Sequence, residues 1–576
     1  MFIRFDKSQP PIASFDFSFL KKPFLASVLL ITFLLGLQFF FFKPYFQLND
    51  DTFKAFFAEG VGTNLIPSEY IGYSNCLWGF ALKTFYTLLP GIAWYGLLIL
   101  LIQAFSLLAF LYSLLLTPHS RFKTLLFLIA WVSFYFLFFS KIQYTATSCL
   151  AAQSGLFLAI SLWRNRESDS CPWGSCLSGF LLFFSSLVRL EGFLITIITA
   201  LPLLVFLFLN ADKSDRLEFF RTKKVFLLVL SSMILFGAAF NYCWYEHDPG
   251  WREFNKFDKE RVEFQDYRIT EYTDQTKPFF DSVGWTQNDY RMFLHWYYMD
   301  TTIFSPEKIS VLKAHFPRVG SKNKTISFES LSALLGSYGG QAFLMFFLTF
   351  LLFLPTEAFR LLLFQLVWLL SLLTFLIYYY RAPDHVFVPL FVLLLNTAIF
   401  FSTVDFKDFF IKKRKWLVLI GLFFLVIATA SSLYVFDQFH QQNLHIRELE
   451  KGLDDSVHLL APKDDQLYVV SCFPYETFNA LDNFNIYKNF HLFELAVYQR
   501  GPDAKKMLDH FGIKDLFLNM VDNPNIFLIC SPEEGSLYQT YMREKHHLDI
   551  YPELYFNNPY FRAYRIHSAK HPSLVK

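Results

Sequence analysis

The chain has 576 residues, of which 54% are hydrophobic and 20% aromatic, while 17% are charged and the formal net charge is +2. Its apolar runs exceed the roughly 18 residues that a bilayer-spanning helix needs, which indicates a membrane protein with several spans. The basic residues are spread over loops instead of being gathered on one soluble face, and this argues against a nucleic-acid-binding protein.

The first apolar run lies between Lys21-Lys22 and Lys43-Pro44. Because no small-residue cleavage site follows it, we predict an uncleaved transmembrane helix and not a signal peptide. The predicted fold class is an α-helical polytopic membrane protein. Eleven spans are expected, near residues 24–42, 92–116, 122–140, 144–163, 175–189, 193–209, 225–244, 334–354, 358–379, 385–403 and 416–436.

Lysine and arginine residues set the expected orientation, since they favour cytoplasmic loops. Placing the amino terminus inside puts the basic loops in the cytoplasm, and Lys412-Lys413-Arg414-Lys415 is the strongest mark among them. The reverse orientation would place every one of these clusters outside. We therefore expect the amino terminus in the cytoplasm and the carboxyl-terminal domain outside. The expected parts are a membrane module at 1–244, an external loop at 245–333, further transmembrane helices at 334–436 and an external domain at 437–576.

Two adjacent carboxylates follow the first span, at Asp50 and Asp51 after Asn49. Carboxylates are costly to hold against hydrocarbon, so a pair fixed at the membrane exit is a candidate site. The alternative is that the pair only marks where the helix meets water. Further along the same external loop, Tyr70–Leu89 is apolar but interrupted by polar residues, which predicts a helix lying at the interface.

Arg189 and Glu191 interrupt a hydrophobic stretch at a tight outward turn between two spans. An arginine near the bilayer core costs about 2.5–3.5 kcal/mol, so one retained there usually has a partner. That partner is either Glu191 at the interface or a lipid phosphate. Arg381 and His385 lie in a later external turn. They either bind the same lipid phosphate as Arg189 or are ordinary turn residues.

The middle loop carries an aromatic and acidic group that includes Trp285 and Asp289. Tryptophan and aspartate together suit sugar stacking and hydroxyl binding. An amphipathic helix that rests on the membrane has the same pattern, so both interpretations stay open.

The last 140 residues or so are long enough for an independent domain. Short buried strands are predicted at Gln466–Phe473, Lys514–Asn519 and Asn525–Cys530, and helices at Asp503–Phe511 and Pro532–His546. The second helix has a good start signal, with serine as N-cap, proline at the first helical position and glutamate at the third. The tail is therefore predicted to be a small α/β domain.

Familiar soluble-enzyme motifs are missing, since the sequence has no Walker loop, no GxGxxG, no HExxH and no Ser-His-Asp spacing. Its seven cysteines form no framework. Cys472 and Cys530 both fall on predicted strands of the tail, and either a disulfide or two buried thiols would fit.

The order of these parts resembles the glycosyltransferase C superfamily, whose members include protein O-mannosyltransferases and lipid A aminoarabinose transferases. Asp50-Asp51 stand where these families carry an acidic pair, and Phe56–Gly60 where they often have a short helix. Pro67–Pro90 is similar to their proline-led interfacial helix, and Arg189–Gly192 to their basic turn near the lipid phosphate. The resemblance covers roughly residues 20–245. The middle loop and tail also resemble uncharacterised bacterial membrane proteins with Asn-Asp-Asp in the first loop, so no particular sugar or acceptor follows.

The resemblance implies transfer of a sugar from a polyprenyl-phosphate donor to a glycan, lipid or protein acceptor. Asp50 would be the general base and Asp51 would orient it, since transfer needs a group to take the acceptor proton. The donor phosphate would be bound by Arg189, with Arg381 and His385, because guanidinium matches phosphate oxygens in a bidentate fork. Glu191, Trp285 and Asp289 would contact substrate.

One departure from the family concerns the second external loop, where Ser140–Thr145 has no acidic residue. No cofactor is certain, and the need for a divalent cation stays open. Two other classes remain as alternatives. A lipid or glycan transporter would usually show repeated halves and mid-span charges, and a non-catalytic envelope-assembly protein would use its tail as the working part.

Overall fold

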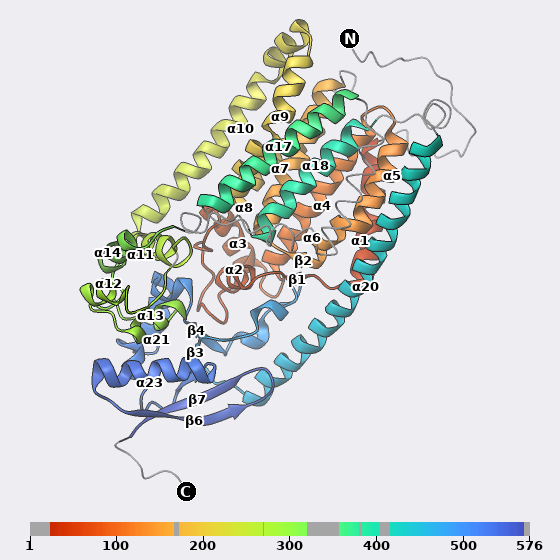
Figure 1. The fold of residues 1–576 in the computed structure, drawn as a ribbon. Coiled ribbons are helices and arrows are strands. Elements are labelled where there is room, and N and C mark those ends of the chain that lie inside the picture. Colours follow the sequence, from red (N-terminus) through yellow and green to blue (C-terminus); the bar gives the residue numbers. More distant parts are fainter. Residues whose placement is uncertain are drawn as a thin grey trace.

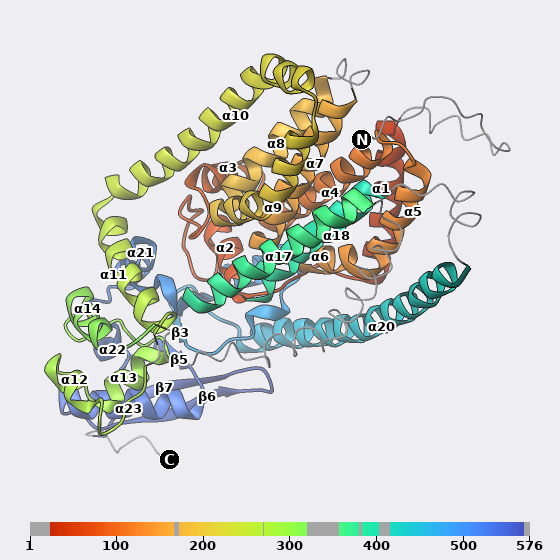
Figure 2. The same cartoon turned by 45° about the horizontal axis from the view of Figure 1, so that its top comes forward.

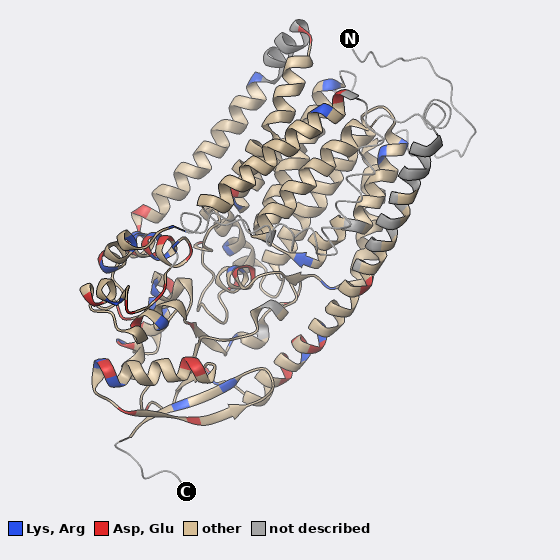
Figure 3. Ribbon diagram, viewed as in Figure 1, with Lys and Arg blue, Asp and Glu red and all other residues tan. Residues whose placement is uncertain are grey.

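The computed structural model describes residues 23–165, 172–268, 270–318, 356–379, 383–402 and 415–569. Long helices form a bundle at one end of the molecule, and a mixed part of short helices and strands lies at the other (Figure 1). The charged residues gather mainly in that mixed part and at the ends of the helices, while few lie along the length of the bundle (Figure 3).

Six of the described helices are long and apolar enough to cross a membrane. They are Pro23–Phe41, Trp94–Leu115, Tyr144–Arg164, Leu190–Asn210, Lys224–His247 and Glu357–Tyr379. Two shorter apolar helices, Trp173–Val188 and His385–Phe401, accompany them. The predicted helical chain with several membrane-length segments is thus confirmed.

Every predicted span that falls on described residues is helical, whereas the one near 334–354 lies outside them. The span predicted at 122–140 consists of α5, a π-helical turn at Trp131–Tyr135 and α6. The bundle helices are α1 (Pro23–Phe41), α4 (Trp94–Leu115), α5 (Ser120–Ala130), α6 (Phe136–Ser140), α7 (Tyr144–Arg164), α8 (Pro172–Val188), α9 (Leu190–Asn210), α10 (Lys213–His247), α17 (Thr356–Tyr379), α18 (Asp384–Phe401) and the start of α20 (Lys415–Leu460).

Helix α7 is the most enclosed helix of the bundle and packs against α4, α8, α9 and α18. Small residues let its neighbours approach closely, as is usual in membrane helix packing. At Gly155, an added Cβ would lie 2.9 Å from Leu182 Cγ and 3.1 Å from the Ser178 carbonyl oxygen of α8. The Ser178 hydroxyl in turn donates to the Gly155 carbonyl oxygen at 2.8 Å.

The first loop folds into a short strand and two helices: β1 (Tyr45–Phe46), α2 (Asn49–Glu59) and α3 (Cys76–Leu88). Strand β1 pairs in parallel with β2 (Lys141–Ile142), which joins the loop to the start of α7. Helix α2 ends at Gly60, whose φ of +76° and crowded surroundings require glycine, since a Cβ would lie 2.3 Å from the Ile66 carbonyl carbon. The apolar helix predicted at Tyr70–Leu89 is α3, which is shorter and starts with Asn75 as its N-cap.

The tail contains a five-stranded sheet in the order β4-β3-β5-β7-β6. Its parallel part pairs β3 (Leu467–Val470) with β4 (His491–Glu494) and with β5 (Ile526–Ile529). Strands β6 (Ile550–Asn557) and β7 (Arg562–Ser568) complete it in antiparallel pairing. With α21 (Pro502–His510) and α23 (Pro532–His546), this confirms the predicted small α/β region at the carboxyl end.

One predicted strand of the tail is wrong. Lys514–Asn519 contains the short helix α22 (Leu516–Asn519), because the Asp515 side chain caps it by accepting from the Leu518 amide. The start signal at Ser531 is confirmed, since its side chain and that of Glu534 form a capping box. Cys472 and Cys530 are free thiols.

The middle loop and the tail share one hydrophobic core instead of forming separate pieces. Helices α11 (Pro249–Gln265), α12 (Lys277–Ser282), α13 (Gln287–Leu294) and α14 (Pro306–His315) contribute to it together with strands β3 and β5. Two helices also cross the predicted borders, since α10 continues past residue 244 and α20 past residue 436. Figure 2 shows α20 as a long helix that runs from the bundle to the sheet.

Backbone hydrogen bonds fasten the first loop to the tail. The Ala480 amide donates to the Pro44 carbonyl at 2.8 Å, and the Leu492 amide of β4 donates to the Gly62 carbonyl at 2.9 Å. The Ser68 hydroxyl donates to Asp503 at 2.6 Å. Helix α2 therefore lies between the bundle and the tail, with nearly all of its side chains buried.

Candidate functional site

Asp51 is completely buried at the amino-terminal end of α2. Its Oδ1 accepts from the Tyr95 hydroxyl at 2.7 Å and from the Tyr144 amide at 3.2 Å. Its Oδ2 is buried without a hydrogen-bond partner among the described residues. Burial raises the pKa of Asp51 to about 7, although the Tyr95 hydroxyl and the charge of Lys54 work in the opposite direction. These contacts hold the carboxyl group in place. Because its pKa is about 7, Asp51 is mostly protonated at mildly acidic pH.

Lys54 lies one turn further along α2 and is also buried. Its ammonium group donates to the Gly72 carbonyl and, at 2.9 Å, to the Ser74 hydroxyl. The same group lies 3.7 Å from the ring centroid of Tyr144, a cation–π contact. Burial and the nearby charge of Arg189 lower the pKa of Lys54 to about 7.

Arg189 joins this cluster from the turn between α8 and α9. Its guanidinium carbon lies 5.1 Å from the ring centroid of Tyr144 and 5.4 Å from that of Tyr73, and it donates a hydrogen bond to the Tyr144 hydroxyl. The Tyr144 ring therefore contacts two cations, Lys54 and Arg189. Asp51 and Arg189, about 140 positions apart in the sequence, are thus joined through Tyr144.

Glu191 pairs with Arg189, since its Oε2 lies 3.2 Å from Arg189 Nε. This contact lacks hydrogen-bond geometry, so the buried Arg189 Nε has no hydrogen-bond partner among the described residues. The Glu191 side chain is 74% exposed, so the ion pair contributes little to stability. The ion pair with Glu191 alone therefore does not explain why an arginine stands at this partly buried position.

Asp50 is the more accessible member of the acidic pair. Its carboxylate makes no hydrogen bond to any residue that the structure describes, and its backbone amide donates to the Asn49 side chain at 3.0 Å. Its charge reaches a second carboxyl group, Glu494 at the end of β4. Burial raises the pKa of Glu494 well above its usual value, and the charge of Asp50 adds to that rise.

The remaining predicted site residues lie elsewhere or outside the described chain. Arg381 is outside the described residues, and His385 is partly buried in the first turn of α18. Trp285 is buried in the core shared by the middle loop and tail, where its indole nitrogen donates to the Ile303 carbonyl at 2.8 Å. Asp289 is buried too, completes the capping box of α13 and pairs with Lys545 at 2.7 Å. Both therefore have structural partners, and the geometry gives no support for sugar contacts by these two side chains.

Tyr95, Tyr144, Lys54 and Glu494 were not predicted as site residues. A tyrosine at either end of an apolar helix is typical of a membrane interface, so Tyr95 and Tyr144 carried no special signal. Lys54 follows Asp50 by four residues, a spacing that usually indicates an ordinary pair on a helix surface. Glu494 reaches the site only through the docking of the tail.

Few side chains near Asp51 could act as ligands to a metal ion. Within the described ranges, no group of three or more histidine, cysteine, aspartate or glutamate side chains could hold a metal ion. Asp51 already uses one oxygen for Tyr95 and the Tyr144 amide. The described residues therefore make no dedicated metal site.

Comparison with known proteins gives no further assignment. No protein-family model matches the chain, and neither a curated protein nor a solved structure matches it.

The Tyr95–Asp51 hydrogen bond makes a pH-dependent prediction. We expect Tyr95→Phe to lower the free energy of unfolding by about 1.5–3 kcal/mol at alkaline pH, the usual worth of a hydrogen bond to a charged group. Asp51 ionises near 3.8 when unfolded but near 7 when folded, so wild-type stability falls between these values and then levels off. Losing the donor raises the folded pKa further, so the variant keeps losing stability above pH 7.

The measurement is thermal unfolding of the purified protein in detergent from pH 5 to pH 9. Tyr555→Phe is the matched control, since Tyr555 is exposed on β6. A difference between Tyr95→Phe and wild type that stays constant or shrinks as the pH rises past 7 would contradict the assigned environment of Asp51.

Proposed function

We propose that the protein is a membrane glycosyltransferase that moves a sugar from a polyprenyl-phosphate donor to an acceptor in the cell envelope. The observation that carries the proposal is that Tyr144 joins Asp51 and Arg189, with Asp50 next to Asp51 in the first turn of α2. A carboxylate base beside a guanidinium is what transfer from a lipid phosphate requires: one group takes a proton and the other holds the departing phosphate.

The two carboxylates are suited to different roles. Asp50 is partly exposed and its oxygens are unbound among the described residues, so it is able to meet an acceptor hydroxyl. Asp51 is locked by Tyr95 and by the Tyr144 amide, so it is a positioning residue that fixes the first turn of α2.

The reaction then follows from the residues. Asp50 takes the proton from the acceptor hydroxyl as its oxygen attacks the anomeric carbon of the sugar. The bond between that carbon and the phosphate oxygen breaks, and the lipid phosphate leaves with the electron pair. Arg189 binds the leaving phosphate, and the Lys54 ammonium lies 3.7 Å from the centroid of the Tyr144 ring that Arg189 also contacts. A single base without a second nucleophile predicts inversion at the sugar carbon.

The proposal includes the orientation of the chain in the membrane. We infer eleven spans, with the amino terminus in the cytoplasm and the cluster of Asp50 and Arg189 at the outer face of a bacterial inner membrane. The support is the predicted placement of basic loops in the cytoplasm and the position of the charged mixed part at one end of the bundle (Figure 3).

Reporter fusions test this orientation directly. A fusion after Lys415 should report the cytoplasm and a fusion after Lys576 the outside, because one span separates the two points. Both fusions reporting the same side would mean that the span count is wrong by one.

The catalytic prediction concerns Asp50. Asp50→Asn keeps the size of the side chain but removes its basicity, so we expect transfer to fall by about 10²–10⁴-fold, the usual contribution of a general base. Asp51→Asn should cost less transfer if Asp51 only positions its neighbour. The assay is sugar transfer by purified protein from a polyprenyl-phosphate sugar, with Asp274→Asn as the control because Asp274 is exposed in the middle loop.

An envelope-assembly protein without catalysis is the main competing account. Under that account Asp50→Asn would insert normally and keep full function in cells. Unchanged transfer by both variants in the direct assay would remove the enzyme proposal. Loss of transfer with Asp51→Asn but not with Asp50→Asn would exchange the two roles.

The donor prediction concerns Arg189. We expect Arg189→Lys to raise the KM for the lipid donor by about tenfold or more, because a point charge replaces a fork that bonds two phosphate oxygens. Protein yield and thermal stability should change little, since the exposed Glu191 pair contributes little. Arg543→Lys is the matched control on the surface of α23. An unchanged donor KM at normal protein yield would leave Arg189 with a structural role.

A further inference from the structure

The rings of Tyr73 and Tyr144 both contact the two cations of the site, Lys54 and Arg189. The Tyr73 ring centroid lies 5.9 Å from the Lys54 ammonium and 5.4 Å from the Arg189 guanidinium carbon. The Tyr144 centroid lies 3.7 Å and 5.1 Å from the same two groups. Tyr144 is 3% exposed, whereas Tyr73 is 39% exposed. The Tyr73 ring is therefore the one that a molecule bound by Arg189 is able to touch.

The backbone of Tyr73 is strained. Its φ is +49°, in the left-handed region that residues other than glycine rarely adopt. The residues on either side of it are held by Lys54, which donates to the Gly72 carbonyl and, at 2.9 Å, to the Ser74 hydroxyl. Strain of this kind persists only where the surrounding structure enforces it, and it is concentrated at functional sites.

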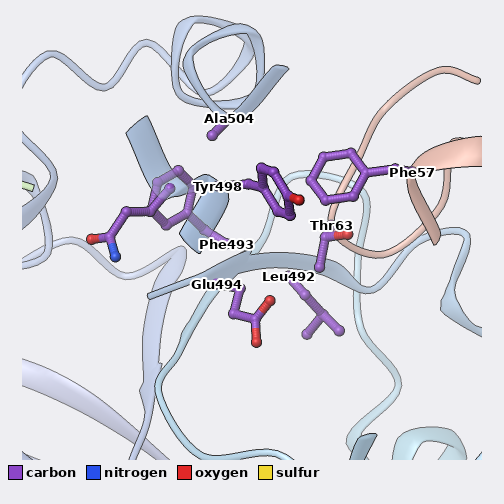
Figure 4. Close-up of a pocket in the computed structure, with 8 residues that line it drawn as sticks. Phe57, Thr63, Leu492, Phe493, Glu494, Tyr498 and Ala504 are labelled. Carbon is purple, nitrogen blue, oxygen red and sulfur yellow. The ribbon is translucent and has the colours of Figure 1, made fainter. Parts of the chain in front are cut away.

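Contacts from the bundle and from the tail hold the same loop. The Asn75 amide donates to the carbonyl of Leu187, near the end of α8, at 2.9 Å. The tail contributes Tyr498, whose ring centroid lies 6.2 Å from that of Tyr73. Tyr498 is itself packed against Phe57 of α2, with ring centroids 5.3 Å apart (Figure 4). These contacts fix the Tyr73 ring beside the turn between α8 and α9.

Anchoring at the membrane surface is the ordinary explanation for a tyrosine in such a loop, because tyrosine is enriched at both membrane–water interfaces. A ring that only anchors the loop among lipid headgroups needs no strained backbone. The strain at Tyr73 and its contact with Arg189 therefore favour a role in binding.

We propose that Tyr73 is a substrate-binding residue and that its exposed ring packs against the sugar of the lipid donor, beside the phosphate that Arg189 binds. The inference rests on the proposed function and names the part of the donor that the first loop contacts. An aromatic ring offers a large apolar face, and one face of a sugar ring presents mainly C–H groups that pack on it. A single oxygen joins the sugar to the phosphorus atom, so a phosphate bound by Arg189 brings its sugar to the neighbouring side chains. The prenyl chain belongs among the apolar helices of membrane length, and Tyr73 lies outside all of those in the described part of the chain.

The test is lipid binding by the purified full-length protein in detergent, measured by isothermal titration calorimetry. The probes are a polyprenyl phosphate without sugar and the same lipid carrying glucose, galactose, mannose or N-acetylglucosamine. We expect at least one sugar-bearing lipid to bind more tightly than the bare phosphate. Tyr73→Asn tolerates the left-handed backbone but removes the ring, so it should weaken that lipid by about tenfold, as expected for the loss of one buried aromatic contact, and leave the bare phosphate unchanged. Tyr73→Phe keeps the ring and should keep the affinity.

Tyr555→Asn is the matched control. Tyr555, on β6 of the tail, is 40% exposed, and its ring centroid lies 4.6 Å from the Arg565 guanidinium carbon. It thus has nearly the same exposure as Tyr73 and the same kind of contact with an arginine, and its loss should change the binding of neither lipid. Normal thermal unfolding of the variants shows that they fold.

The outcomes separate the sugar contact from the donor site. Selective weakening of the sugar-bearing lipid in Tyr73→Asn supports the inference, even if no transfer is found. Equal weakening of both lipids overturns it, because the ring would then only steady Arg189 or anchor the loop. Arg189→Lys that weakens both lipids while Tyr73→Asn weakens neither would reject the sugar contact and keep the donor site. Wild-type protein that binds none of these lipids would contradict the proposed function and the inference together.

Discussion

Burial of the first turns of α2 is the constraint on which the site depends. Asp51 and Lys54 are both enclosed, and enclosing charged groups is costly unless each has partners. Tyr95, the Tyr144 amide and the Gly72 carbonyl supply those partners. Because each contact comes from a different segment, holding α2 in place also fixes the start of α4, the start of α7 and the loop before α3.

The tail completes this enclosure. Phe53 and Phe56 of α2 pack edge-on against aromatic rings of the tail, with centroids 4.6 Å apart for Phe53 and Tyr475. The close fit extends to Gly72, where an added Cβ would lie 1.5 Å from the Tyr498 hydroxyl oxygen. The tail is therefore part of the site, because it covers α2 and brings Glu494 to the vicinity of Asp50.

Position and polarity single out part of the candidate site in the sequence. Asp50, Asp51 and Arg189 stand out because charged residues beside apolar segments are rare, and in the structure Tyr144 contacts both Asp51 and Arg189. Tyr144 and Glu494 could not be predicted in the same way, since each looks ordinary in its own segment and gains its place only by tertiary packing. Trp285 and Asp289 show the limit of a local pattern, because a tryptophan and a capping aspartate in a folded core have the same local pattern as a sugar site.

The fold was predictable to a similar degree. Long apolar helices and the capped helix at Ser531 have strong local signals and were found where expected. Strand β6 was missed because most of its side chains are exposed, so it lacks an apolar pattern. Lys514–Asn519 was read as a strand because its capping aspartate was overlooked. The shared core of the middle loop and tail joins segments about 200 residues apart, which no local pattern indicates.

The most direct measurement is an experimental structure of the full-length protein with a bound polyprenyl phosphate. The account predicts the phosphate within hydrogen-bond distance of the Arg189 guanidinium, with the Asp50 carboxylate facing the sugar-bearing side. A lipid phosphate bound elsewhere, with Arg189 still in contact with Tyr73, Tyr144 and Glu191, would contradict the account.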